Sequence, residues 1–238
     1  MTRRQHRSFK TPDNREIKIW RYLDFPKFVA LLTSRCLFFC QLDQLKKEDP
    51  FEGTVSSSWS RQAELVRPGL DVPLRDSVRK QRPWVLVNCW HMNEHESTVM
   101  WKHYAGSDCS VCVQSTFARL DDCLPEDVFL GTVKYISYEE EPMDFGNLFF
   151  PIMHKRKSFE HERELRAVRC DVQACEKGME KPPNCGESIP VDLGKLIQNI
   201  YVAPSAPEWF LKLVEDICTK FELNVPISRS SQDAEPMY

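Results

Sequence analysis

One short segment concentrates carboxylates at the spacing of a β-strand. It reads Phe159-Glu-His-Glu-Arg-Glu-Leu-Arg166. In a strand, Glu162, Glu164 and Arg166 share one face with Glu160, and neighbouring carboxylates are about 6.5 Å apart. Such a row repels itself unless cations or a ligand compensate its charge. The segment therefore predicts either an acidic ligand site or a solvated edge strand whose charges oppose aggregation.

A second segment, Cys89–Tyr104, gathers polar and aromatic side chains directly after an apolar run. It holds three of the six histidines, together with two tryptophans and a tyrosine. Such groups at a strand end are a common way to build a ligand cleft. The residues that we expect to contact a ligand, here and in the neighbouring segments, are Tyr22, Trp90, His91, Asn93, Ser97, Trp101, Tyr104 and Arg166.

Other chemistries fit these residues less well. His91 and His95 have i, i+4 spacing, but the order His-Glu-x-x-His is absent, and we expect no metal. Nucleophilic catalysis by Cys89 or Ser97 lacks a recognised elbow or cap motif. The pair Cys109 and Cys112 stands without a second Cys-x-x-Cys, which favours core packing over zinc. The chain also has no glycine-rich phosphate loop.

The charge balance provides no global field for a polyanion. The 238 residues include 32 basic and 35 acidic side chains, for a net charge of -3. A nucleic-acid partner would need a local basic patch, such as residues 75–82 or 154–157, although such runs are more often solvated faces. No signal peptide or membrane helix is expected, which favours a cytoplasmic protein that contacts no membrane.

The periodicity predicts a mixed α+β fold. Alternation after Glu16 indicates a strand, and Asp24 with Pro26 begins a helix whose apolar stripe includes Phe28 and Leu32. Further helices are expected at about 54–66, 72–81, 96–104 and 207–221. Further strands are expected at 36–40, 84–90, 109–114, 128–138, 163–170 and 188–192. We expect one α+β domain over 15–230, with loose tails at 1–14 and 231–238.

Taken together, several motifs resemble the microbial family catalogued as domain of unknown function 2971. They are Trp20-Arg21-Tyr22, Asp49-Pro-Phe-Glu-Gly53, Cys89-Trp-His91 to Glu96-Ser97, Met100-Trp101 to Tyr104, and Phe159–Arg166. The resemblance continues through Val191-Asp-Leu193, Ile200–Pro204 and Trp209, and spans about residues 17–230. It implies no established activity.

A more remote resemblance is to the ADP-ribosyltransferase-like fold, which implies a split, largely antiparallel sheet flanked by helices. Arg21, the Trp90–Tyr104 segment and Glu162-Arg-Glu164 fall in the order of that fold's functional elements. The resemblance implies NAD as cofactor, with Arg21 anchoring the dinucleotide and Trp90 or Tyr104 stacking on nicotinamide. Glu164 would then stabilise the oxocarbenium charge on the ribose, while Glu162 orients the acceptor. The middle motif is Cys-Trp-His where the fold has Ser-Thr-Ser. This departure weakens the argument that the ligand is NAD.

Three functions follow as hypotheses. The first is a transferase or glycohydrolase that cleaves an N-glycosidic bond, most simply ADP-ribosyl transfer from NAD to a protein or nucleic-acid acceptor. The second is a noncatalytic domain that recognises a nucleotide or peptide in a microbial defence or stress system. The third is a nucleic-acid-processing protein. In the first two, a small nucleotide is the expected ligand.

Overall fold

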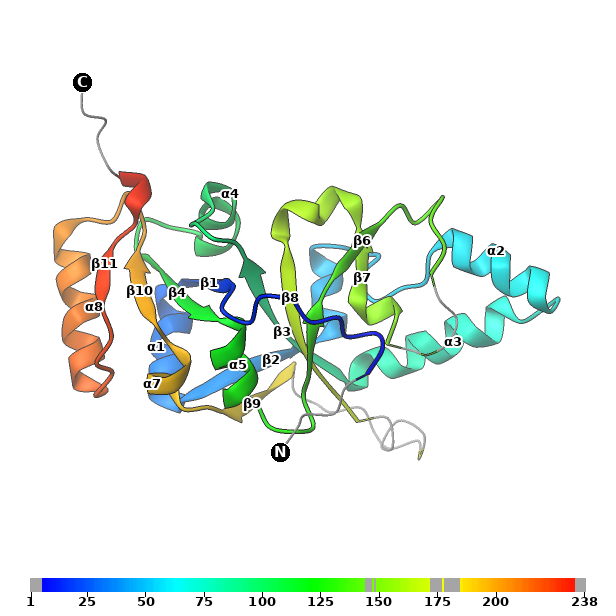
Figure 1. The fold of residues 1–238 in the computed structure, drawn as a ribbon, viewed down its shortest axis with the longest axis horizontal. Helices are drawn as coiled ribbons and strands as arrows, with labels where there is room; N and C mark the ends of the chain where they lie inside the picture. Colours follow the sequence, from blue (N-terminus) through cyan, green and yellow to red (C-terminus); the bar gives the residue numbers. More distant parts are fainter. Residues whose placement is uncertain (1–5, 144–146, 148, 172–176, 178–184, 234–238) are drawn as a thin grey trace, which may run out of the picture. The chain divides into compact units, whose positions relative to one another are not determined.

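The computed structural model describes residues 6–143, 147, 149–171, 177 and 185–233. Within them the chain is a mixed α+β protein with a mostly antiparallel sheet flanked by helices (Figure 1). This confirms the fold class expected from the sequence. The likeness to the ADP-ribosyltransferase fold stays a prediction. None of the described helices has the length and apolar character needed to cross a bilayer.

The chain divides into two compact units. Unit 1 comprises Met1–Thr11, Phe39–Cys89 and Glu126–Glu187, and unit 2 comprises Pro12–Phe38, Trp90–Pro125 and Ser188–Tyr238. The division falls inside three strands, β2 (Cys36–Gln41), β3 (Val85–Met92) and β9 (Gly186–Pro190). The expectation of one domain over 15–230 stays a prediction.

Unit 2 is built on four neighbouring strands. β1 (Lys18–Asp24) runs antiparallel to β4 (Ser110–Thr116), and β4 runs antiparallel to β10 (Asn199–Val202). β11 (Ile227–Arg229) pairs in parallel with β10. The end of β3 pairs with β1 through Trp20 and His91. Figure 1 shows α8 (Glu208–Lys220) alongside β10 and β11.

Local signals account for the first helix of unit 2. Asp24 caps α1 (Phe25–Ser34) by accepting a 2.8 Å hydrogen bond from the Lys27 N–H. Pro26 lies in the first turn, where its missing N–H costs nothing. Arg35, at φ 51°, ends the helix in the left-handed region. The predicted strand, helix and strand of this region are thus confirmed. Besides α1 and α8, the described helices of unit 2 are short, namely α4 (Thr98–Met100), the π-helical turn η3 (Trp101–Ala105), α5 (Phe117–Cys123), α7 (Leu193–Leu196) and the 3-10 turn η6 (Ser231–Asp233).

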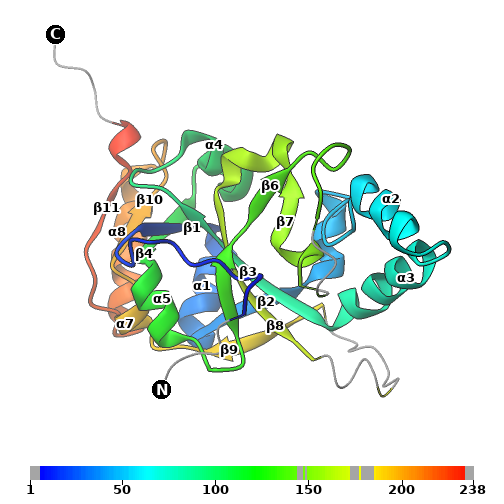
Figure 2. The same cartoon turned by 45° about the vertical axis from the view of Figure 1, so that its right-hand side comes forward.

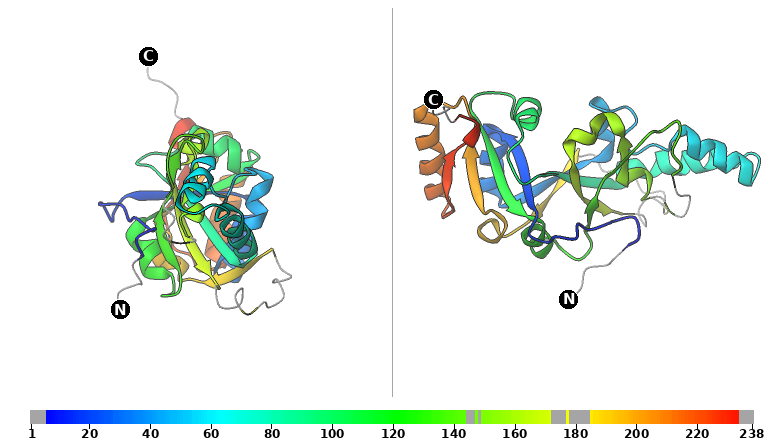
Figure 3. Two further views of the ribbon diagram at one scale, coloured as in Figure 1. Left: turned by 90° about the vertical axis from the view of Figure 1, so that its right-hand side faces the viewer. Right: turned by 45° about the horizontal axis from the view of Figure 1, so that its top comes forward.

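Unit 1 combines strands with a helical hairpin. β8 (Glu164–Cys170) pairs with β3 and runs antiparallel to β5 (Phe129–Thr132). β6 (Lys134–Ile136) and β7 (His154–Arg156) form a separate parallel pair, visible in Figure 2. The helices α2 (Ser57–Val66) and α3 (Asp71–Gln81), cyan in Figure 3, pack against each other. Short 3-10 helices complete the unit, namely η1 (Leu42–Lys47), η2 (Arg82–Trp84), η4 (Pro151–Met153) and η5 (Lys157–Glu162).

Two predicted elements differ from those observed. The expected strand at 128–138 is two strands, β5 and β6, because the chain leaves the β5 ladder at Val133. The expected helix at 96–104 is only α4 followed by the π-helical turn. Ser97 caps that helix in an extended conformation, and residues 93–96 lie outside it.

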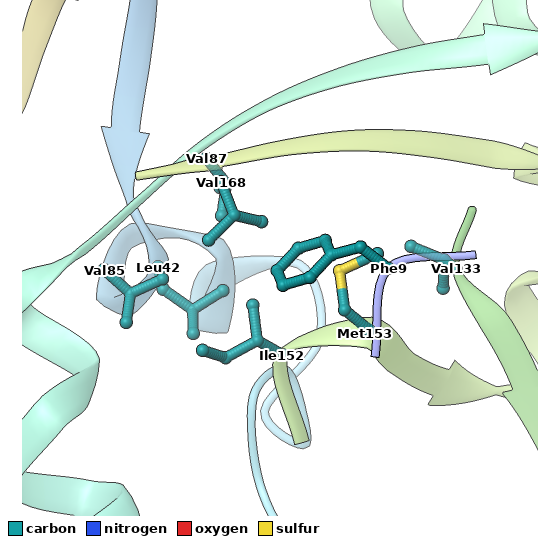
Figure 4. Close-up of a cluster of buried hydrophobic side chains, with 8 residues drawn as sticks. All are labelled: Phe9, Leu42, Val85, Val87, Val133, Ile152, Met153 and Val168. Carbon is teal, nitrogen blue, oxygen red and sulfur yellow. The ribbon is translucent and has the colours of Figure 1, made fainter. Parts of the chain in front are cut away.

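The core of unit 1 includes a residue from the N-terminal segment. Phe9 is buried and stacks on Phe129 at 5.0 Å between ring centroids. Figure 4 shows it among Leu42, Val85, Val87, Val133, Ile152, Met153 and Val168. Gly131 permits this approach, because a Cβ there would lie 2.7 Å from Phe9 Cα. The segment predicted to be a loose tail therefore contributes to the core at Phe9.

We predict that Phe9→Ala destabilises the protein by about 3 to 5 kcal/mol, the usual cost of removing a buried phenylalanine ring. Urea unfolding followed by tryptophan fluorescence measures the change. Phe38→Ala serves as the control, because Phe38 is 44% exposed, and it should cost little. An equal, small loss for both variants would mean that the N-terminal segment is loose after all.

Candidate functional site

Three of the residues predicted for the ligand cleft gather around a fourth, Tyr22, in unit 2. The ring of Trp101 meets the Tyr22 ring edge to face at 5.0 Å, and the backbone N–H of Ser97 donates to the Tyr22 hydroxyl at 2.8 Å. Glu96 accepts a 3.0 Å hydrogen bond from the Trp101 indole. His91 lies 6.4 Å from Tyr22 between ring centroids. The structure thus brings Tyr22, His91, Ser97 and Trp101 together.

Burial sets the chemistry of this cluster. It raises the pKa of the Tyr22 phenol far above its usual value, and the neighbouring Cys112 thiol adds to the shift. Tyr22 therefore stays neutral and acts as a hydrogen-bonding group that holds the Ser97 backbone.

The other predicted residues of unit 2 occupy different places. The guanidinium of Arg21 lies over the Trp90 ring at 5.9 Å, a cation–π contact. Asn93 accepts, through its carbonyl, a 2.7 Å hydrogen bond from the Trp20 indole. Tyr104 is 36% exposed, with its ring 6.3 Å from His103. These contacts are compatible with packing as well as with ligand binding.

A cleft of about 410 Å³ lies beside Trp101 in unit 2. We call it the Trp101 cleft. Its other described lining residues are Thr98, Lys102, Ala105, Gly106, Ser107, Asp108, Ser110, Ala203, Pro204, Ser205 and Gln232. The C-terminal segment closes one side, because Ser231 donates to Glu96 and the Thr98 hydroxyl donates to Gln232. The start of the expected loose tail at 231–238 is therefore bonded to unit 2, while residues 234–238 lie outside the described part.

The carboxylates of Glu162 and Glu164 belong to a buried ion cluster in unit 1. The cluster comprises Glu52, Lys155, Glu162, Glu164 and Arg166, all at most 7% exposed. Arg166 donates to both carboxylate oxygens of Glu164, at 2.6 and 2.8 Å, and to Glu52 at 2.7 Å. Lys155 pairs with Glu162 and lies 3.6 Å from Glu52. The carboxylates that the sequence singles out are thus compensated by cations of the same unit.

The prediction of one continuous acidic strand is wrong. Glu160 and Glu162 lie in the 3-10 helix η5, and Arg163 adopts the left-handed region at φ 42° before β8 begins. Only Glu164 and Arg166 alternate on a strand face. The break lets Glu162 reach Lys155, and Glu160 stays exposed.

The three residues given catalytic roles fall in different units. Arg21 belongs to unit 2, whereas Glu162 and Glu164 belong to unit 1. Their convergence on one pocket, on which the NAD-cleaving hypothesis depends, stays a prediction. Cys89 is adjacent to Glu164, and burial raises the pKa of its thiol well above the usual value. A neutral thiol is a poor nucleophile.

Sequence reasoning missed a second cleft, which lies wholly in unit 1 and has a volume of about 620 Å³. We call it the basic cleft. Its cationic groups are Arg7, Lys10 and Lys134, with His154 beside them, and its described lining contains no carboxylate. The remaining lining residues are Ser8, Gln62, Thr132, Val133, Pro142, Met143, Phe150 and Met153. Residues 154–157 form one of the basic runs in the sequence, but of these four residues only His154 lines the cleft.

Alternate residues of the strands β6 and β7 line the basic cleft and contact the ion cluster. On β6, Lys134 lines the cleft, whereas the Tyr135 hydroxyl accepts a 2.9 Å hydrogen bond from the Glu164 N–H. On β7, His154 lines the cleft, whereas Lys155 joins the ion cluster. Successive side chains of a strand point to opposite faces. The β6–β7 pair therefore separates the cluster on one face from the cleft on the other.

Arg166 also fixes a wall of the basic cleft. Its guanidinium donates a 2.6 Å hydrogen bond to the carbonyl of Ile152 in η4. The next two residues, Met153 and His154, line the cleft. Among the described residues, no group of three or more His, Cys, Asp or Glu side chains is arranged to hold a metal ion.

No family model, curated protein or solved structure matches this chain. The family membership and residue roles implied by the sequence resemblances therefore stay predictions.

We predict that Glu164 makes stability depend on pH. Burial disfavours its charge, but Arg166 and Lys155 outweigh that effect and lower its pKa from the usual 4.5 to about 2. Its stabilising contribution, on the order of 3 kcal/mol, is complete above pH 4.5 and is lost as pH falls toward 2. The stability difference between wild type and Glu164→Gln should therefore shrink by about 2 kcal/mol between pH 5 and pH 3.

Urea unfolding at several pH values measures this difference. Glu160→Gln is the matched control, because Glu160 is exposed on η5, and its difference from wild type should change little. A Glu164→Gln variant with the wild-type pH dependence would contradict the ion pairing.

Proposed function

We propose that this protein binds an anionic nucleotide in the basic cleft of unit 1. The observation that carries the proposal is the pairing of three cations with an apolar floor. Arg7, Lys10 and Lys134 supply positive charge, and the described lining contains no carboxylate. Anions are the ligands that such a site favours.

The apolar part of the cleft favours a ligand that also carries a flat ring. Val133, Met143 and Met153 are buried residues that line it, and the Phe150 ring borders the same space. The guanidinium of Arg7 lies 5.6 Å from the Phe150 ring centroid. Aromatic and apolar walls with a few polar groups are typical of small-molecule sites, and the volume of about 620 Å³ falls in their usual range of roughly 300 to 1,000 Å³.

The surroundings of Glu164 support binding in preference to turnover. Both of its carboxylate oxygens accept from Arg166, and the β6–β7 pair separates the ion cluster from the basic cleft. A ligand in the cleft is therefore held by cations and is out of reach of Glu164. The proposal corresponds to the noncatalytic nucleotide-recognition hypothesis and keeps a small nucleotide as the ligand.

We predict that AMP binds the purified protein and that Lys134→Glu weakens its affinity at least about tenfold, because a charge-assisted hydrogen bond contributes roughly 1.5 to 3 kcal/mol. Isothermal titration calorimetry measures the affinity. Lys134 is exposed, so the fold should survive the substitution. Lys212→Glu is the matched control, since Lys212 is exposed on α8 of unit 2.

Adenosine and inorganic phosphate serve as control ligands that test the contributions of the ring and of the charge separately. Each should bind more weakly than AMP, because adenosine lacks the charge and phosphate lacks the ring. Equal affinities of wild type and Lys134→Glu for AMP, or no AMP binding at all, would contradict the proposal.

We further predict that NAD binds without release of nicotinamide. Incubation with NAD followed by chromatography of the products measures turnover, with Glu164→Gln in parallel. Nicotinamide release by the wild type that is abolished in Glu164→Gln would contradict a binding role. It would support the transferase or glycohydrolase hypothesis instead.

A further inference from the structure

His154 is the one histidine among the described residues lining the basic cleft. Its Nδ1 lies 2.7 Å from the carbonyl oxygen of Phe150. A carbonyl only accepts hydrogen bonds, so Nδ1 carries the hydrogen, and Nε2 of the neutral ring carries a lone pair. Nε2 is then the ring nitrogen that can contact a ligand.

Cations from two neighbouring segments face His154. Lys134 is its partner across the β6–β7 pair. The carbonyl of Lys10 accepts a 2.8 Å hydrogen bond from the Thr132 N–H, which places Lys10 two residues along from Lys134. Arg7 lines the same cleft through its contact with Phe150. On β7 itself, the neighbouring Lys155 takes part in the ion cluster.

Among the described residues, Tyr138 is a further titratable neighbour, and its hydroxyl donates to the His154 carbonyl at 3.2 Å. Burial lowers the pKa of His154, and the charges of Lys134 and Lys10 lower it further, against the opposing effect of the Phe150 carbonyl. Without a bound anion, the imidazole is therefore neutral at pH 7.

We infer that the ligand of the basic cleft is a phosphomonoester and that its binding transfers one proton from solvent to Nε2 of His154. This inference rests on the proposed nucleotide binding. The oxygens of a phosphate dianion can only accept hydrogen bonds, and so can the lone pair of Nε2. A contact between them requires one hydrogen. The imidazole gains that proton and one positive charge, and no covalent bond of the ligand changes.

The transfer makes binding depend on pH with a definite sign. The dianion stabilises the imidazolium and raises the pKa of His154 in the complex. Protonation of His154 adds no pH dependence below the pKa of the free imidazole, and it makes affinity fall by up to about tenfold per pH unit between the free and bound values. A phosphomonoester, whose second pKa is near 6, is already a dianion above pH 7. The proton taken up there goes to the protein.

The test is titration calorimetry of the full chain with AMP at pH 7.5, in buffers of different ionisation enthalpy. The slope of the observed heat against that enthalpy gives the number of protons taken up. We expect about one for the wild type and about zero for His154→Asn. The asparagine amide keeps a donor near the Phe150 carbonyl and does not titrate. Affinity of the wild type should fall between pH 7 and pH 8.5, while that of the variant should stay constant.

The outcomes separate this inference from the proposed function. AMP binding with a slope of zero, or with the same proton uptake in His154→Asn, would overturn the inference and leave nucleotide binding intact. No AMP binding in any buffer would overturn both. Retention of wild-type urea stability by His154→Asn would show that a changed slope does not come from unfolding.

Discussion

The buried charge of Arg166 is the constraint on which the rest of unit 1 depends. Its side chain is fully buried, and an uncompensated guanidinium there would cost several kcal/mol. Glu164 and Glu52 neutralise it, and Lys155 with Glu162 completes the cluster. These residues come from the 49–53 turn, β7, η5 and β8. The need to satisfy one charge therefore fixes how four segments of unit 1 meet.

The same constraint positions the basic cleft. Arg166 holds Ile152, Lys155 directs one face of β7 toward the cluster, and Tyr135 does the same for β6. Strand alternation then places His154 and Lys134 on the opposite face. The cluster concentrates acids on one side of the β6–β7 pair and leaves cations on the other. The described lining of the cleft therefore holds three cations and no carboxylate, in a protein whose overall charge is -3.

The sequence predicts the parts of this architecture that local rules determine. Helix α1 is predicted by Asp24, Pro26 and the apolar stripe, because a helix cap acts over only three residues. Local rules do not predict the ion cluster, because Glu52 and Arg166 are 114 residues apart in the sequence. Nothing near either residue indicates its partner. Arg163 breaks the predicted acidic strand through its left-handed conformation, which no periodicity signals. Arg7 and Lys10 of the basic cleft come from a segment predicted to be loose. Strand alternation also separates the basic run 154–157, because His154 lines the cleft and Lys155 joins the ion cluster. The sequence predicts that Ser97 and Trp101 lie close together because both belong to the segment that follows β3, whereas Tyr22 joins them from β1.

We expect an anionic nucleotide to bind in the basic cleft and not in the Trp101 cleft. Backbone amide NMR spectra recorded during a titration with AMP distinguish the two sites. Binding in the basic cleft should give saturable shifts concentrated at residues 7–10, 132–134 and 153–154 of unit 1. Shifts concentrated instead at residues 98–110 and 203–205 of unit 2, or no saturable shifts, would contradict it.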